Sequence, residues 1–183
     1  MEIMINQLHS DNQLNEWQAS FEKHNIYRTG EYYSMCLQEN IIGNRMTLFG
    51  SVNGVMAGCC HLKYISDYSF FKERNIPEIN DLNVFSEFRR IGIANKLMDH
   101  MELHAAKFTP YIGIGVGLYK DYGSAQRIYC RRGYIPDGNG MIYHNEIVEP
   151  GSKVCVDDDL NLYFIKKVMD DENDLSQYLS MKE

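Results

Sequence analysis

The spacing of apolar residues changes along the chain, and each spacing predicts an element. Residues 2–8 predict a first strand. In the next segment, three apolar residues lie three and four positions apart, the spacing of one face of an amphipathic helix: Leu14, Trp17 and Phe21. Asp11 or Asn12 would cap this helix. The chain therefore begins with a predicted strand and a predicted helix.

Residues 31–40 predict a second short helix. Two apolar runs follow, residues 45–52 and 55–65, and Asn53-Gly54 separates them. Asn and Gly both tolerate a positive φ, so this dipeptide between apolar runs is a strong hairpin signal. The two runs are predicted to be paired antiparallel strands.

Residues 66–75 interrupt the pattern and predict a loop or a short helix, whose aromatic side chains belong either to a lid or to the core. Residues 76–85 predict a strand. The apolar positions beyond residue 93 then share one helical face that ends before Pro110: Ala94, Leu97, Met98, Met101 and Ala105.

The last third of the chain predicts three strands and one helix. Residues 111–118 predict a buried strand, and residues 124–132 predict a helix closed by Gly133. Residues 141–147 and 160–168 predict two further strands. The strands and helices together favour a mixed α/β fold.

Composition supports one ordinary globular domain over residues 1–183. The chain has 183 residues, of which 44% are hydrophobic and 23% charged, so it can bury a core. No linker or repeat divides it. The acidic segment 171–183 is expected to fray.

Charge and hydropathy exclude several classes of function. The formal net charge of −7 argues against nucleic-acid binding, which needs a basic face. No apolar run is long enough to span a membrane, and the first residues lack the features of a signal peptide. We therefore expect a cytoplasmic protein.

No metal is expected either. The five cysteines include no C-x-x-C pair. His100 and His104 have the spacing of a metal-binding pair on a helix, but no further ligand motif accompanies them. A solvated helix face is the simpler interpretation.

The stretch from Arg89 to Ala94 joins a predicted strand to a predicted helix. The first N–H groups of a helix have no partner within the helix, and the helix dipole makes this end an anion site. Gly92 allows close approach, Ala94 is small, and Arg89 and Arg90 add positive charge. A pyrophosphate would suit this turn, although a plain turn with two solvated arginines gives the same pattern.

Two motifs in register decide between these interpretations. Arg89-Arg90-Ile91-Gly92-Ile93-Ala94 follows Leu82-Asn83-Val84, and Tyr129 precedes Arg131-Arg132-Gly133-Tyr134. This combination resembles the GNAT superfamily of N-acetyltransferases, over about residues 46–168. It is most similar to a bacterial subgroup whose acceptors are mostly unassigned.

The resemblance implies a fold and a cosubstrate, acetyl-CoA. The implied sheet is mixed and mostly antiparallel, with six to seven strands, two splayed parallel central strands and about four helices. Backbone of Leu82, Asn83 and Val84 would hold pantetheine. The pyrophosphate would lie on the amides of six residues: Arg89, Arg90, Ile91, Gly92, Ile93 and Ala94. Family members often carry Asn near the start of the later helix. That Asn hydrogen-bonds the cofactor, and this chain departs from the pattern, with Asp121-Tyr122-Gly123-Ser124 in the corresponding region. Ser124 is the candidate to replace the Asn contact.

The resemblance also implies catalytic residues. An ammonium acceptor must lose a proton before it attacks a thioester, and the leaving thiolate gains one. Glu78 occupies a position where many family members carry a glutamate, and is the first candidate for the base; Asp81 is the second, on the other face of a regular strand. Tyr129 is the candidate acid. Alternatively, Glu78 is a solvated carboxylate and Tyr129 a core side chain.

The glycine-rich stretch Gly113 to Gly117 has another role. A dinucleotide fingerprint must open a helix, whereas these glycines alternate within a predicted strand. Close approach of the pantetheine arm would explain them. An NAD-dependent oxidoreductase is therefore not favoured.

The sequence predicts an N-acetyltransferase that moves the acetyl group of acetyl-CoA to a primary amine of a small molecule or peptide, by direct attack in a ternary complex. The alternative is a catalytically weak acyl-CoA-binding module that senses or regulates. Homodimers are frequent in the family, so a homodimer is compatible with the resemblance.

Overall fold

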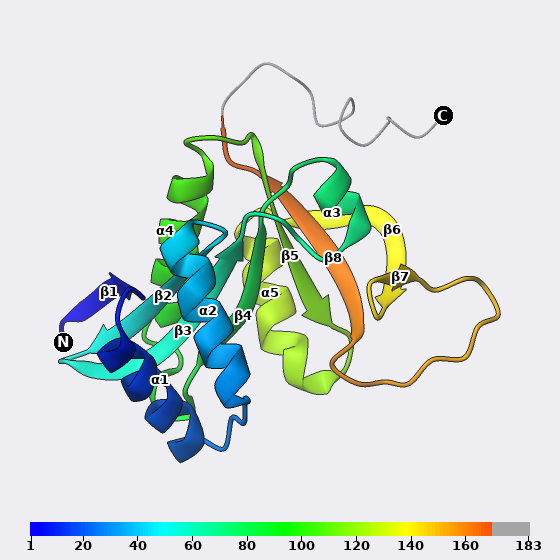
Figure 1. Ribbon diagram of the computed structural model, residues 1–183. Coiled ribbons are helices and arrows are strands. Elements are labelled where there is room, and N and C mark those ends of the chain that lie inside the picture. Colours follow the sequence, from blue (N-terminus) through cyan, green and yellow to red (C-terminus); the bar gives the residue numbers. More distant parts are fainter. Residues whose placement is uncertain (170–183) are drawn as a thin grey trace. The chain divides into compact units, whose positions relative to one another are not determined.

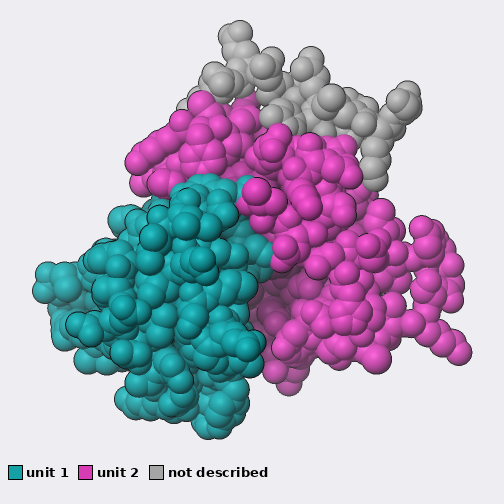
Figure 2. All heavy atoms as spheres, viewed as in Figure 1, with its two compact units in different colours: residues 1–64, 79–101 teal, residues 65–78, 102–183 magenta. Residues whose placement is uncertain are grey.

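The computed structural model describes residues 1–169, and the predicted acidic tail lies outside these residues. The chain divides into two compact units (Figure 2): the first contains residues 1–64 and 79–101, the second 65–78 and 102–183. The chain passes from one unit to the other after residues 64, 78 and 101. Both units are thus discontinuous in sequence, and a single domain over residues 1–183 stays a prediction.

Four strands and three helices build the first unit (Figure 1). The strands lie in the order β1-β2-β3-β4, and β1–β2 and β2–β3 pair antiparallel. The elements are β1 (Ile3–Gln7), α1 (Asp11–Lys23), α2 (Gly30–Ile42), β2 (Arg45–Val52), β3 (Val55–Lys63), β4 (Glu78–Val84) and α4 (Ile93–Ala105). Glu78 at the start of β4 belongs to the second unit, as does the last part of α4.

The hairpin of β2 and β3 is confirmed. Asn53 and Gly54 connect the strands with φ values of 48° and 81°, as the dipeptide predicts. Phe49 and Gly50 are consecutive on β2 and face opposite sides. Phe49 contacts Trp17 of α1, with ring centroids 5.6 Å apart. A Cβ at Gly50 would lie 2.9 Å from Ile93 of α4. Helices therefore pack on both faces of this hairpin.

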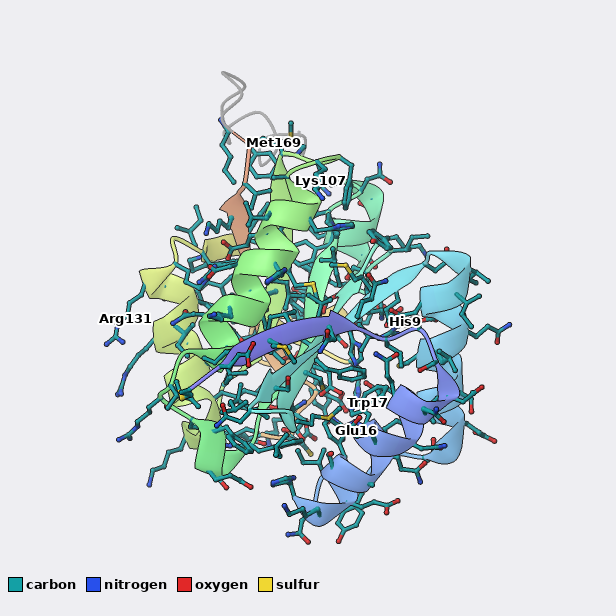
Figure 3. The ribbon with its side chains drawn as sticks, turned by 90° about the vertical axis from the view of Figure 1, so that its left-hand side faces the viewer. His9, Glu16, Trp17, Lys107, Arg131 and Met169 are labelled. Carbon is teal, nitrogen blue, oxygen red and sulfur yellow. The ribbon has the colours of Figure 1, made fainter. Side chains whose placement is uncertain are left out.

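The core of the first unit lies beneath α1 and α2. Trp17 is fully buried there, whereas His9, before α1, and Glu16, next to Trp17 on α1, are exposed (Figure 3). The predicted face of α1 is confirmed for Trp17 and Phe21, with Leu14 partly buried against them. Ser10 caps α1, accepting a hydrogen bond from Gln13 N. The predicted caps at Asp11 and Asn12 are wrong, since Ser10 is the residue with extended backbone directly before the first turn.

Four further strands and two helices build the second unit. The strands lie in the order β5-β8-β6-β7, and all three pairings are antiparallel. The elements are α3 (Ser69–Glu73), β5 (Tyr111–Gly117), α5 (Gly123–Arg131), β6 (Ile135–Tyr143), β7 (Glu146–Ile147) and β8 (Leu160–Lys167). Gly133 follows α5 with a φ of 85°, as predicted for a helix end.

The aromatic residues of segment 66–75 belong to the core of the second unit. Phe71 is fully buried, and Tyr68 stacks on Tyr163 with centroids 4.0 Å apart. A Cβ at Gly113 would lie 2.1 Å from the Phe71 ring, and one at Gly117 would lie 2.4 Å from Tyr122. Close approach of the pantetheine arm is therefore the wrong explanation for these two glycines, because aromatic rings occupy the space beside them.

The predicted strand over residues 141–147 is also wrong in its form. The chain turns at His144 and Asn145, whose φ values are 50° and 65°, and β6 and β7 pair across this turn. Residues 1–169 contain eight strands and five α-helices, more than the six to seven and four expected. The mixed α/β fold class is confirmed. The splayed parallel pair stays a prediction.

Candidate active site

The turn between β4 and α4, the predicted pyrophosphate site, contains two residues with left-handed backbone. Arg90 and Gly92 both adopt left-handed backbone, with φ of 63° and 96°, directly before α4 begins at Ile93. Left-handed backbone within a turn can bring successive N–H groups to one concave surface. The first turn of α4 adds the N–H groups that have no acceptor within a helix. Phosphate binding at this loop stays a prediction, and the left-handed backbone of Arg90 and Gly92 is compatible with it.

The two arginines of this turn differ in their contacts. Arg89 Nε donates a hydrogen bond to the carbonyl oxygen of Val84 at 3.1 Å, so its side chain ties the turn back to the end of β4. Arg90 is exposed. The Arg89 side chain is therefore engaged with the backbone of its own turn, whereas the Arg90 side chain is exposed to solvent.

Asp81 breaks the regular geometry of β4. Its φ is 48°, a conformation that L residues rarely adopt within a strand and that Asp tolerates better than most. Asn83 Nδ2 donates both to the Asp81 carbonyl oxygen at 3.1 Å and to Oδ1 at 2.8 Å. The predicted alternation of faces along this strand therefore does not extend through Asp81.

The Asp81 carboxylate is held by side chains from far away in the sequence. Arg28 Nη2 donates to Oδ1 at 2.9 Å, and the Tyr32 hydroxyl donates to Oδ2 at 2.8 Å. Burial alone would raise the pKa of the Asp81 carboxyl, but this pKa is lowered, because the charge of the Arg28 guanidinium and the hydrogen bonds from Tyr32 and Arg28 stabilise the carboxylate. The Asp81 carboxylate is thus ionised and accepts hydrogen bonds at both oxygens.

His61 belongs to the same network and is fully buried. Burial lowers its pKa to about 3, so the ring is neutral at pH 7 and Arg28 supplies the charge that stabilises Asp81. The Tyr32 hydroxyl donates its single proton to Asp81. Its oxygen therefore accepts a hydrogen bond from His61 Nε2 at 3.0 Å. Nδ1 then accepts from the Thr47 hydroxyl at 2.7 Å. The hydrogen bonds of this network therefore all point the same way: Thr47 donates to His61, His61 to Tyr32, and Tyr32 to Asp81.

Glu78 lies in the second unit in a different environment. Its side chain is buried, with 4% of the residue exposed, and Oε2 accepts a hydrogen bond of 2.5 Å from the Ser66 hydroxyl. Just before it, the carbonyl oxygen of Pro77 accepts from Gly113 N at 2.9 Å. Within the second unit, this contact joins the residue before Glu78 to β5.

The other predicted site residues of the second unit lie on α5. Tyr129 is 5% exposed, and the centroid of its ring lies 6.2 Å from that of Tyr134. Ser124 is exposed in the first turn. Arg131, at the other end of the helix, extends into solvent (Figure 3). The roles of Tyr129 and Ser124 stay predictions.

Within residues 1–169, no group of three or more His, Cys, Asp or Glu side chains is suited to hold a metal ion. No helix in this part of the chain has the length and apolarity needed to cross a bilayer.

Sequence reasoning missed the partners of both candidate bases. The network around Asp81 comes from residues that are remote from it in sequence and belong to no motif: Arg28, Tyr32 and His61. No local pattern therefore predicts these partners. Ser66 had a weak signal: a serine two residues before Tyr68, ahead of a short helix, is typical of a side-chain turn.

Comparison with known proteins identifies a family. The model of the acetyltransferase (GNAT) family matches residues 7–134, more than half of the chain. No curated protein matches the chain.

Solved structures share the fold at low identity. The ribosomal-protein-S18-alanine N-acetyltransferase of Escherichia coli has a TM-score of 0.67 and 12% identity, covering 95% of this chain and 99% of that one. An N-acetyltransferase of Staphylococcus aureus Mu50 has a TM-score of 0.66 and 14% identity, covering 92% and 99%. An acetyl transferase of Salmonella typhimurium that modifies the N-terminal serine of ribosomal protein L7/L12 has a TM-score of 0.66 and 11% identity, covering 90% and 94%. The chain therefore belongs to the acetyltransferase (GNAT) family and is an N-acetyltransferase enzyme.

Proposed function

We propose that this enzyme transfers an acetyl group from acetyl-CoA to a primary amine of a small molecule or peptide, in a ternary complex and in the cytoplasm. The observation that carries the cosubstrate assignment is the left-handed pair Arg90 and Gly92 directly before α4. Acetyl-CoA supplies an activated acetyl group as a thioester. The amides of residues 89–94 would hold its pyrophosphate, and the backbone of residues 82–84 its pantetheine.

Glu78 is the proposed general base and Tyr129 the proposed acid. An amine acceptor is mostly protonated at neutral pH and has no lone pair until a proton leaves, so a carboxylate that accepts this proton, directly or through water, permits attack. A phenol near the sulfur would donate a proton to the leaving thiolate. Ser124 is the proposed additional contact to the cosubstrate.

The geometry favours Glu78 over Asp81 as the base. Asp81 accepts hydrogen bonds from Arg28, Tyr32 and Asn83, and its lowered pKa makes it a weak proton acceptor. A base needs a pKa near the working pH. Asp81 instead suits a structural role in the irregular part of β4 around its left-handed backbone.

The acceptor is proposed to be an amine of a peptide or small molecule. Two of the similar structures are enzymes that act on a protein's alanine or N-terminal serine, so peptides beginning with Ala or Ser are the first acceptors to test. A homodimer is compatible with this proposal.

The test is a turnover screen with acetyl-CoA, in which released thiol is measured against such peptides, amino acids, small amines and amine antibiotics. Glu78→Gln and Tyr129→Phe should each lower kcat/KM by about 10²-fold or more. Glu16→Gln and Tyr27→Phe change exposed residues in the same way and serve as matched controls.

The alternative is a catalytically weak acyl-CoA-binding module. Measured CoA binding together with no thiol release across the whole screen would favour it. Undiminished turnover in the Glu78→Gln, Tyr129→Phe double variant would contradict the proposed chemistry.

A further inference from the structure

We infer that Ser66 is a positioning residue for the Glu78 carboxylate. The Ser66 hydroxyl donates to Glu78 Oε2 at 2.5 Å, and only 1% of Ser66 and 4% of Glu78 are exposed. This inference rests on the proposed role of Glu78 as the base. It adds a residue that acts on the base through a hydrogen bond and does not itself touch the reacting atoms.

The direction of this hydrogen bond is determined by a second one. The backbone N–H of Tyr68 donates to the Ser66 oxygen at 3.0 Å, a turn in which a serine side chain bonds the backbone two residues later. A serine hydroxyl has one proton to donate. The amide of Tyr68 can only donate and an ionised carboxylate can only accept, so the hydroxyl proton is directed to Glu78.

Tyr68 is itself held at its other end. Its hydroxyl donates to Asp137 Oδ2 at 2.8 Å, and Asp137 is 4% exposed and also accepts from Asn139 N at 3.0 Å. The Tyr68 ring stacks on Tyr163 of β8. The segment that carries Ser66 is therefore tied to β6 and β8, and the hydroxyl has little freedom to follow Glu78 if the carboxylate moves.

Two consequences follow for the base. A donor to one carboxylate oxygen restricts rotation of the carboxylate plane, which keeps the base aligned with the acceptor. The same donor stabilises the ionised form, the form that accepts a proton. Loss of the hydroxyl should therefore affect the chemical step more than acceptor binding.

The experiment compares Ser66→Ala with Ser66→Thr and with Ser69→Ala, using acetyl-CoA and the best acceptor of the screen. Ser69 is an exposed serine three residues away, so its variant is a matched control. In Ser66→Ala, kcat should fall about tenfold or more with KM nearly unchanged. The acidic limb of the kcat profile should move to higher pH by about one unit. Ser66→Thr retains the hydroxyl and should restore most activity; Ser69→Ala should match the parent enzyme.

A second readout needs no acceptor. In protein with ¹³C-labelled glutamate side chains, the Glu78 resonance is identified by its absence in Glu78→Gln. Its titration midpoint should be higher in Ser66→Ala than in the parent protein. An unchanged midpoint and an unchanged pH profile in folded Ser66→Ala would overturn the inference about Ser66 while Glu78→Gln remains inactive. Full activity of Glu78→Gln would instead overturn the proposed base, and the inference with it.

Discussion

The carbonyl oxygen of Asn83 lies so close to Gly58 that a Cβ at Gly58 would be 2.3 Å from it. The same Cβ would lie 3.1 Å from the Cα of Val84. Backbone atoms cannot move aside as the end of a flexible side chain can. Glycine on β3 therefore permits the close approach of that part of β4 which is proposed to hold pantetheine.

Gly58→Ala should displace this part of β4. We expect the free energy of unfolding to fall by about 1–3 kcal/mol, as for other overpacked sites, and the Kd for CoA to rise. Urea denaturation and calorimetric titration with CoA measure the two effects. Gly30→Ala is the control, because Gly30 begins α2 with nothing within 4 Å of its Cβ position. Parent-like CoA affinity in Gly58→Ala would separate this contact from cosubstrate binding.

The proposed phosphate loop, residues 89–94, provides a second prediction. Gly92 has a φ of 96°, so Gly92→Ala introduces strain of about 1–3 kcal/mol and should raise the Kd for CoA by about tenfold or more. If backbone amides dominate CoA binding, Arg90→Gly should raise the Kd for CoA less than Gly92→Ala does, because glycine at position 90 keeps both the N–H and the left-handed backbone. Gly43→Ala is the control: Gly43 has a φ of 79° at the end of α2, remote from this loop in sequence. A larger loss of affinity in Arg90→Gly than in Gly92→Ala would show that side-chain charge dominates.

Tyr32→Phe should destabilise the first unit. The variant removes the donor to Asp81 Oδ2 and the acceptor for His61 Nε2 from a largely buried network. Buried polar groups left without a partner cost about 1–3 kcal/mol each. Urea denaturation should therefore show a drop of at least that size. Tyr27→Phe alters an exposed tyrosine and should stay near the parent value; equal stability of the two variants would contradict the assignment.

The buried, neutral state of His61 predicts how stability depends on pH. Its pKa in the folded protein is about 3, against an ordinary value of 6.5. Between these values the unfolded chain binds more protons, so stability is fully present above about pH 6.5 and falls as pH decreases toward 3. The slope contributed by one group is at most about 1.4 kcal/mol per pH unit.

Urea denaturation between pH 4.5 and 7.5 tests this prediction. His61→Gln should flatten the decline, whereas His9→Gln, at an exposed position, should leave it unchanged. The lowered pKa of Asp81 acts in the same direction but at lower pH, because its carboxylate protonates only at more acidic pH. An unaltered slope in His61→Gln would show that the imidazole is not the group responsible.

Local patterns predicted most elements correctly because the interactions behind them lie within a few residues. Asn53-Gly54 predicted the hairpin of β2 and β3, and the spacing of Trp17 and Phe21 predicted the buried face of α1. The same local reasoning failed at His144 and Asn145, where a short turn divides an apolar run. Both residues adopt left-handed backbone there, and only pairing between β6 and β7 reveals it.

The sequence by itself determined the family, and it was enough to propose the phosphate loop over residues 89–94 and the candidate bases Glu78 and Asp81, because each lies within a short motif. Tertiary structure alone distinguished the two carboxylates. Asp81 meets a guanidinium and a phenol from the segment around α2, whereas Glu78 meets a serine hydroxyl held by Tyr68. A carboxylate's proton affinity depends on which donors and charges surround it. Folding brings those groups together from positions as far as 53 residues apart, so no local spacing encodes them.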